Sequence, residues 1–251
     1  MLNAERKERI LSTLEHFGVV KLTDLVEKLN CSESTIRRDL IELEEDGLLE
    51  RVHGGAKLVK QHNLEPSMNE KSFKNIQSKR EIAAYAAEQV ETNDFIYLDA
   101  GSTTIEMIPF LKDKKVTVVT NGLMHIEKLV QLQIDSYLLG GKMKAHTKAV
   151  IGAVALDNIQ NYHFDKVFMG TNAIHERSGF MTPDPEEAFL KRAAVHLAEQ
   201  SFVLADHSKF SEANFAKMFE LEQAVIITDF LPEEQNRETF IQKTKIIEVE
   251  K

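Results

Sequence analysis

Five short apolar runs in the second part of the chain constrain the fold more than any other feature of the sequence. They lie between residues 95 and 206 and read FIYLDA, VTVVT, SYLLG, KVFMG and SFVLAD. Their apolar residues are consecutive rather than alternating, which predicts strands that are buried on both faces. Helix-forming stretches such as REIAAYAAEQV lie around and between the runs. The pattern predicts an α/β sheet covered by helices.

In such a sheet, ligands bind where the strands end, so the residues that follow each run are candidate binding residues. The most informative segment follows the first run and precedes an expected helix: Asp99, Gly101, Ser102, Thr103 and Thr104. Small residues, hydroxyls and backbone N–H groups at a helix N-terminus suit an anion such as phosphate. The segment lacks the Gly-Lys-Ser/Thr of a P-loop and the GxGxxG of a dinucleotide turn, so nucleotide binding is not supported.

Residues at other strand ends and two further segments could converge on the same pocket. The strand ends add Thr120, Asn121, Gly140, Gly141 and the run Gly170-Thr171-Asn172, while Glu187 and Lys191 lie one helical turn apart and Lys209 follows the last run. Each has an ordinary explanation when taken alone, since glycines make tight turns, Ser-Thr-Thr caps helices and Glu187 with Lys191 has the spacing of an exposed ion pair. Their number at strand ends favours a shared binding site.

The first sixty residues predict a separate small domain of three helices. Apolar residues one helical turn apart predict helices over residues 4–17 and 22–29, and Ser32 can cap a third. The apolar stripe of the third helix faces the core, which leaves four side chains near its N-terminal end pointing elsewhere: Ser34, Thr35, Arg37 and Arg38. Such residues read base edges and phosphates in the major groove when they lie on a recognition helix.

A Gly-Gly pair after the third helix predicts a β-hairpin wing. Gly54 and Gly55 suit the positive φ of a hairpin turn, and Arg51, His53 and Lys57 lie on or near the wing. These basic residues could clamp phosphates beside the recognition helix. An isolated pair of basic residues usually lies on a solvated surface without a binding role. Here, however, the order of a helix, a turn, a helix with its arginines near one end and its acids at the other, and a wing favours DNA binding.

The net charge argues against nucleic acid. It is −9 for the chain, and residues 1–60 hold 10 Lys and Arg against 12 Asp and Glu. The acids of the third helix cluster at the end away from the expected groove. The placement of the arginines, rather than the total charge, therefore decides whether a duplex can bind.

Over residues 3–58 the sequence resembles the signature of the DeoR family of bacterial transcription regulators. The residues that carry the likeness include Ser34-Thr35-Ile36-Arg37-Arg38-Asp39-Leu40 and Arg51-Val52-His53-Gly54-Gly55-Ala56. The resemblance implies a winged helix-turn-helix with Arg37 and Arg38 on its recognition helix. Asp39 is expected to orient a neighbouring arginine rather than to touch DNA.

Residues 75–234 are similar to the sensor domain of the same family, whose fold resembles ribose-5-phosphate isomerase. Five motifs of the family have counterparts in this sequence. Its Asp-x-Gly-Ser-Thr motif corresponds to Asp99, Gly101, Ser102 and Thr103, its Thr-Asn to Thr120 and Asn121, and its Gly-Gly to Gly140 and Gly141. Its Glu-x-x-x-Lys corresponds to Glu187 and Lys191, and its Asp-x-Ser-Lys to Asp206, Ser208 and Lys209. The resemblance implies a phosphorylated sugar as effector, with the hydroxyl loop holding phosphate and a lysine adding charge.

The expected organisation is a DNA-binding domain over 3–58, a linker over 59–74, a sensor domain over 75–234 and a C-terminal segment over 235–251 that packs on the sensor. The expected partners are double-stranded operator DNA, a phosphorylated sugar, with fructose 1-phosphate as the best choice, and a second copy or more in a homodimer or homotetramer. No cofactor is expected. The absence of a secretory signal or a long apolar run predicts a cytoplasmic protein without a membrane span.

Two alternatives belong to other functional classes. The larger domain could be a working sugar-phosphate isomerase, with Glu187, Asp99 or Asp206 as general base, because proton abstraction needs only a well-placed carboxylate. Metal binding has little support, since the nine histidines form no His-x-His or His-x-x-x-His pair. The single cysteine, Cys31, excludes an internal disulfide.

Overall fold

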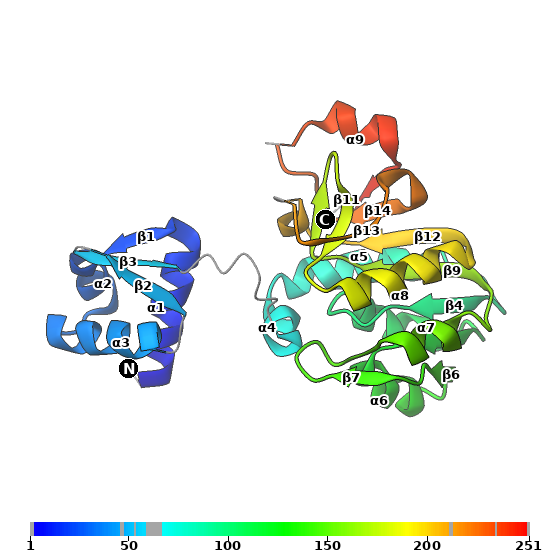
Figure 1. Ribbon diagram of the computed structural model, residues 1–251, viewed down its shortest axis with the longest axis horizontal. Coiled ribbons are helices and arrows are strands. Elements are labelled where there is room, and N and C mark those ends of the chain that lie inside the picture. Colours follow the sequence, from blue (N-terminus) through cyan, green and yellow to red (C-terminus); the bar gives the residue numbers. More distant parts are fainter. Residues whose placement is uncertain are drawn as a thin grey trace. The chain divides into compact units, whose positions relative to one another are not determined.

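The computed structural model describes residues 3–45, 48–52, 54–58, 67–210, 213–233 and 235–249. The chain divides into two compact units, Met1–His62 and Asn63–Lys251 (Figure 1). Each unit has an apolar core of its own. None of the helices in the described ranges is long and apolar enough to span a membrane.

The first unit consists of three helices and a small antiparallel sheet. The helices are α1 (Asn3–Phe17), α2 (Leu22–Leu29) and α3 (Glu33–Glu45). The strands are β1 (Val19–Lys21), β2 (Leu49–Val52) and β3 (Gly55–Leu58), in the order β1-β3-β2. The predicted helices and hairpin are therefore confirmed, and the apolar stripe of α3 is buried, as its spacing requires.

Two glycines determine the geometry of the β2–β3 hairpin. Gly54 has a φ of +82°, which side chains with a Cβ rarely adopt, and its carbonyl accepts a hydrogen bond of 2.8 Å from the Leu22 N–H. A Cβ at Gly55 would lie 2.2 Å from the carbonyl oxygen of Val20. The hairpin can therefore pack closely against β1 only because both positions are glycine.

The second unit is built on a seven-stranded parallel sheet in the order β15-β14-β12-β9-β4-β5-β6. Its strands are β4 (Phe95–Leu98), β5 (Thr117–Thr120), β6 (Asp135–Leu138), β9 (Phe164–Gly170), β12 (Ala198–Leu204), β14 (Val225–Thr228) and β15 (Ile246–Glu248). The five predicted runs supply five neighbouring strands. Strands β14 and β15 extend the sheet beyond β12 and were not anticipated from the sequence.

Helices cover both faces of this sheet, as the apolar runs require. One core contains residues of α5 (Ile76–Glu88), of the 3-10 helix η1 (Thr104–Leu111) and of α6 (Leu123–Gln131), and the other contains residues of α7 (Ala153–Ile159), α8 (Pro185–His196) and α9 (Arg237–Lys243). Successive residues of β4 belong to opposite cores, with Tyr97 in one and Ile96 and Leu98 in the other.

The strand order reverses between β4 and β9. After β4 the chain adds β5 and β6 on one side, and after β9 it adds β12, β14 and β15 on the other. In an open parallel sheet, such a reversal leaves a crevice beyond the carboxyl ends of the two central strands. The fold therefore predicts a ligand site where β4 and β9 end.

Smaller elements surround the sheet. Strand β7 (Lys142–Lys144) pairs with β8 (Ala149–Ile151), and β10 (Ala173–His175), β11 (Gly179–Thr182) and β13 (Ala216–Phe219) form a second antiparallel sheet. A short helix, α4 (Met68–Phe73), belongs to the second unit, although residues 59–74 were expected to be a linker. Residues 59–66 lie outside the described ranges.

Candidate nucleic-acid interface and effector pocket

A groove in the first unit lies between α3 and the β2–β3 hairpin. Its lining residues are Leu22, Arg37, Leu40, Arg51, Val52, Gly54 and Gly55. The structure thus brings an arginine near the start of α3 together with the arginine and the glycines of the hairpin. This arrangement places positive charge beside the surface that a winged helix-turn-helix turns toward a duplex.

The two arginines of α3 are exposed. Arg37 forms an ion pair of 2.6 Å with Glu33, one helical turn earlier, and its side chain is 62% exposed. The Arg38 side chain is also exposed, and no ion pair joins it to another described residue. An exposed ion pair contributes only about 0–1 kcal/mol, so a phosphate or a base edge can replace Glu33.

The other expected DNA-binding residues lie at the start of α3 and on the hairpin. Ser34 is exposed, and the hydroxyl of the half-buried Thr35 lies 2.8 Å from that of Ser32. Arg51 and Lys57 pair with Glu44 and Glu50 at 2.6 and 3.0 Å. His53 lies outside the described residues.

The Arg51–Glu44 contact connects the hairpin to α3. The Arg51 N–H and guanidinium both donate to the Glu44 carboxylate, and these hydrogen bonds lower the pKa of Glu44. Glu44, near the end of α3, therefore partly neutralises the positive charge of the wing.

Asp39 acts inside the first unit rather than on its surface. Its side chain is 1% exposed and accepts hydrogen bonds from the guanidinium of Arg6 on α1, one of them at 3.0 Å. Asp39 thus orients an arginine, as expected, but that arginine is Arg6 rather than a neighbour on α3. The contact fixes α3 against α1.

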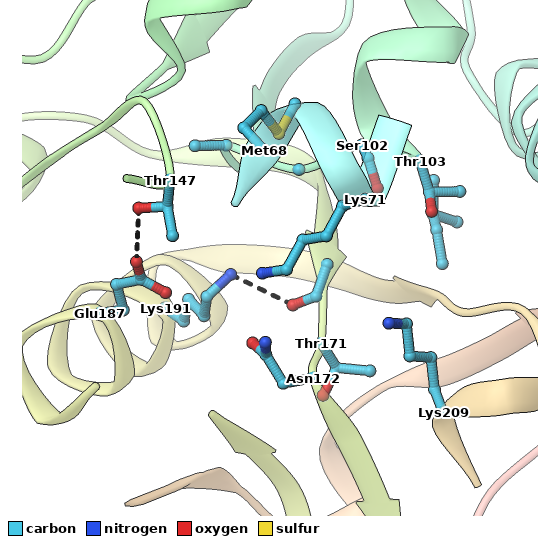
Figure 2. Close-up of a pocket in the computed structure, with 14 residues that line it drawn as sticks. Met68, Lys71, Ser102, Thr103, Thr147, Thr171, Asn172, Glu187, Lys191 and Lys209 are labelled. Carbon is cyan, nitrogen blue, oxygen red and sulfur yellow. Dashed lines mark hydrogen bonds between the residues drawn. The ribbon is translucent and has the colours of Figure 1, made fainter. Parts of the chain in front are cut away.

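A pocket in the second unit opens where β4, β9 and β12 end (Figure 2). Nine residues that the sequence offered as candidate binding residues line it: Gly101, Ser102, Thr103, Gly170, Thr171, Asn172, Glu187, Lys191 and Lys209. The other lining residues come from α4, from the turn between β7 and β8 and from the strand ends: Met68, Lys71, Ala100, Thr147 and Leu204. The pocket lies at the reversal point of the sheet.

The pocket has the chemistry of an anion site. Within the described ranges, its charged lining residues are Lys71, Lys191, Lys209 and Glu187. Among the hydrogen bonds between described residues, none uses the backbone N–H groups of Ser102 and Thr103, which directly precede η1. Excess lysine beside unpaired N–H groups at the start of a helix favours a phosphate-like ligand.

A buried ion pair holds Lys191 beneath the pocket. Lys191 Nζ contacts Asp99 Oδ2 and donates to the Gly170 carbonyl at 3.1 Å, and the Gly170 N–H donates to Asp99 Oδ2 at 2.9 Å. Asp99 and Lys191 are 1% and 5% exposed. Burial raises the pKa of Asp99, and the Lys191 ammonium opposes this shift. The pair joins the ends of β4 and β9 to α8.

Glu187 is held by a separate set of contacts. Its carboxylate accepts hydrogen bonds from Lys144 Nζ at 2.8 Å, from the Thr147 hydroxyl at 3.0 Å and from the Thr182 hydroxyl at 3.4 Å. It is 6% exposed. Glu187 and Lys191 are therefore buried residues with different partners, rather than the exposed ion pair that their spacing alone would suggest.

Several expected effector residues support the pocket without lining it. The hydroxyls of Thr104 and Thr120 donate to the carbonyls of Asp99 and Leu98, both at 2.6 Å, and Asn121 Oδ1 accepts from the Ala100 N–H at 2.8 Å. These three side chains are buried and fix the loop after β4. Gly140 and Gly141 are also absent from the residues that line this pocket.

His125 lies beneath the same loop. Its Nδ1 is 2.8 Å from the Thr120 hydroxyl, and burial lowers its pKa to about 4. The imidazole is therefore neutral at neutral pH. It acts as a polar support for the strand end, not as a source of positive charge.

The sequence pattern missed Met68 and Lys71 because they lie in the expected linker. Figure 2 shows Lys71 extending from α4 into the pocket and Lys209 pointing into it from the segment after β12. Thr147 was also missed, whereas Thr171 and Asn172 had been noted at a strand end. A lone lysine in a polar stretch gives no signal of its own.

Related proteins are similar over nearly the whole chain. The "Uncharacterized HTH-type transcriptional regulator FruR" of Bacillus subtilis (strain 168) is 50% identical over 229 residues, which cover 91% of each chain. The "Lactose phosphotransferase system repressor" of Streptococcus mutans is 34% identical over 91% of this chain and 93% of its own. The structural neighbours include ribose 5-phosphate isomerase A from Methanocaldococcus jannaschii, with a TM-score of 0.42, 18% identity and 55% of each chain covered.

Two family models together match most of the chain. The DeoR-like helix-turn-helix domain matches residues 6–62, and the DeoR C-terminal sensor domain matches residues 74–230. The first match contains α3 and the hairpin, and the second contains the residues that line the pocket at the end of β4 and β9, except Met68 and Lys71. The chain therefore belongs to the DeoR family of DNA-binding transcription regulators, rather than to a family of enzymes.

Proposed function

We propose that this protein represses a sugar-utilisation operon and releases its operator when a phosphorylated sugar binds the pocket of the second unit. The observation that carries the proposal is the pocket itself, where three lysines and a hydroxyl-bearing loop meet at the reversal point of the sheet. The name of the Streptococcus mutans relative, a lactose phosphotransferase system repressor, supports a role in sugar uptake.

In this proposal, the groove between α3 and the hairpin faces operator DNA. Arg37 and Arg38 hydrogen-bond to base edges, and Ser34 and Thr35 contact the adjacent backbone. The residues of the hairpin clamp phosphates: Arg51, His53, Gly54, Gly55 and Lys57. A symmetric operator requires at least a homodimer, and a homotetramer satisfies the same symmetry.

Fructose 1-phosphate is the proposed effector. The half-identical Bacillus relative is named FruR, and the pocket offers suitable groups for both parts of such a ligand. Ser102, Thr103 and Lys209 hold the phosphate, while the Asn172 amide accepts and donates hydrogen bonds to sugar hydroxyls and the Glu187 carboxylate accepts them, directly or through water. Asp99, Thr104, Thr120 and Asn121 keep these groups in place, and Lys191 adds charge from below.

A gel-shift assay on a DNA fragment selected by the protein from a random pool tests the proposal. Fructose 1-phosphate is expected to release the DNA, whereas fructose alone is not. The variant Ser102→Leu with Thr103→Leu should bind the DNA but resist release. If no phosphorylated sugar in a panel affects DNA binding, the effector role of the pocket is wrong.

The DNA contacts need a separate variant. Arg37→Ala with Arg38→Ala should abolish sequence-specific binding while the second unit melts as in the parent protein. Lys142→Ala, which removes an exposed lysine of the second unit, is the matched control and should leave binding unchanged. Retained sequence-specific binding by the double variant would remove these arginines from the interface.

A further inference from the structure

The short helix α4 connects two parts of the molecule that the proposed function must couple. It contributes Met68 and Lys71 to the lining of the pocket. It also follows the boundary between the two units, at His62 and Asn63, by only a few residues. No other helix or strand that lines the pocket lies so near this boundary in the described sequence.

Contacts with the rest of the second unit hold α4 in place. A helix of six residues is too short to be stable alone, even with the Ser67–Glu70 capping box that begins it. The Met68 N–H donates to the His146 carbonyl at 3.0 Å, and the Met68 side chain is 4% exposed. His146 lies in the turn between β7 and β8, beside the pocket residue Thr147. The stability of α4 therefore depends on surfaces that also form the pocket.

A buried lysine holds the other end of α4. Lys79 on α5 is 2% exposed, and its Nζ donates to the Lys71 carbonyl. Burial lowers the pKa of Lys79 to about 8; Asp206 opposes this shift, while Lys209, Lys71 and Lys74 increase it. The Asp206 carboxylate in turn accepts hydrogen bonds from Asn75 Nδ2 at 2.9 Å and from Ser208.

The region around α4 therefore has an excess of positive charge. Lys71, Lys74 and Lys209 lie close enough to Lys79 to disfavour its charged form, and two of them, Lys71 and Lys209, line the pocket. A phosphate group between them would offset this repulsion and could form charge-assisted hydrogen bonds with both.

We propose that Lys71 binds the phosphate of the effector together with Lys209, and that α4 is the element through which binding stabilises the start of the second unit. The inference rests on the proposed function and adds to it one phosphate-binding residue, Lys71, and one element, α4, that couples effector binding to the start of the second unit. Because a six-residue helix such as α4 is not stable alone, one more ionic contact shifts the population in which it is docked. Because α4 follows the boundary between the two units by only a few residues, a change in its docking affects the segment that connects it to the DNA-binding unit.

The binding part is tested with the full chain and two variants. Lys71→Gln removes the proposed contact, and Lys74→Gln, an exposed lysine on the same segment, is the matched control. With inorganic phosphate and fructose 1-phosphate as probes in calorimetric titrations, Lys71→Gln should bind at least about tenfold more weakly, while Lys74→Gln binds as the parent does. Lys71→Arg should retain most of the affinity, since it keeps the charge.

The coupling part is tested by hydrogen exchange of the backbone amides. Addition of fructose 1-phosphate should slow exchange over residues 67–74 in the parent protein and in Lys74→Gln, but not in Lys71→Gln. In the gel-shift assay, Lys71→Gln should bind DNA normally and require more sugar for release.

The outcomes separate this inference from the proposed function. If Ser102→Leu with Thr103→Leu loses binding while Lys71→Gln keeps it, the role of Lys71 is wrong and the phosphosugar pocket stands. If the parent binds the sugar without slower exchange over residues 67–74, the route through α4 is wrong. If the parent binds neither inorganic phosphate nor any phosphorylated sugar, both proposals fail.

Discussion

At the scale of single residues, the pocket depends on charges that are removed from water. Asp99 and Lys191 are almost fully buried, and each has the other as its ionic partner. The sequence identified both as site residues but could not identify their pairing, because the two lie far apart along the chain. Burial of one charge without the other would be strongly unfavourable.

Replacement of Asp99 by Ala is expected to destabilise the second unit by about 3–5 kcal/mol, since it leaves the Lys191 ammonium buried without a carboxylate. Glu186→Ala is the matched control, because it breaks a Lys–carboxylate pair at 3.1 Å that is exposed. That change should cost about 0–1 kcal/mol. Urea unfolding of the second unit measures both, and equal effects would contradict the structural role of the buried pair.

The buried Lys79 gives a pH dependence whose sign follows from its pKa. The pKa is about 8 in the folded protein and 10.5 for an unperturbed lysine, so between these values the unfolded chain binds more protons than the folded one. The free energy of unfolding should therefore gain a contribution from Lys79 that rises with pH through this window. Denaturation at pH about 7 and about 9.5 measures it, and Lys79→Met should reduce the rise; an identical pH dependence in that variant would contradict the assignment.

At the scale of elements, the sequence predicted those helices and strands whose buried faces follow from the local spacing of their apolar residues. The helices α1 to α3 and the strands β4, β5, β6, β9 and β12 are of this kind. Strand β14 carries the same apolar signal over Val225–Thr228 and could have been found. Strand β15 and the small antiparallel sheets of the second unit could not, because their three- or four-residue strands owe their position to partners elsewhere in the chain.

The pocket also contains parts that local sequence patterns predict and parts that depend on distant contacts. The loop after β4 was predictable, since small and hydroxyl-bearing residues follow a buried strand. The contribution of α4 was not, because it depends on the docking of a six-residue helix that local propensity does not favour. Nine of the candidate residues line the pocket, and the lining residues Met68 and Lys71 were assigned to a linker.

The hairpin of the first unit offers a prediction at this scale. Gly55→Ala is expected to destabilise that unit by about 1–3 kcal/mol and to weaken DNA binding, because the new Cβ would overlap the Val20 carbonyl. Gly140→Ala is the control, since a Cβ there would have no neighbour within 4 Å. Thermal unfolding and gel shifts of both variants make the comparison, and an unchanged Gly55→Ala protein would mean that the hairpin packs differently.

At the scale of the whole molecule, a protein with a net charge of −9 must bind a polyanion. The groove beside Arg37 and Arg51 provides local positive charge, but Glu33 and Glu44 are paired with those arginines in the free protein. DNA must compete with these carboxylates, and the rest of the anionic surface repels it at long range.

Operator affinity is therefore expected to depend steeply on salt. Each phosphate contacted releases counterions, which gives a slope of log affinity against log salt of about −0.9 per contact. Dissociation constants measured over a series of potassium chloride concentrations give the slope. A flat response would show that few phosphates are contacted and that Arg51 and Lys57 do not clamp the backbone.

The reversal of strand order between β4 and β9 also affects how such a sensor can diversify. The ladder that joins β4 to its neighbours ends at Leu98, before the loop that begins the pocket. Mutations of the loop residues Ser102 and Thr103 are thus expected to alter ligand preference without disturbing the sheet, in contrast to Asp99, whose buried ion pair supports the fold. One architecture can in this way serve regulators of many nutrients, and directed evolution for a new inducer should begin at these strand ends.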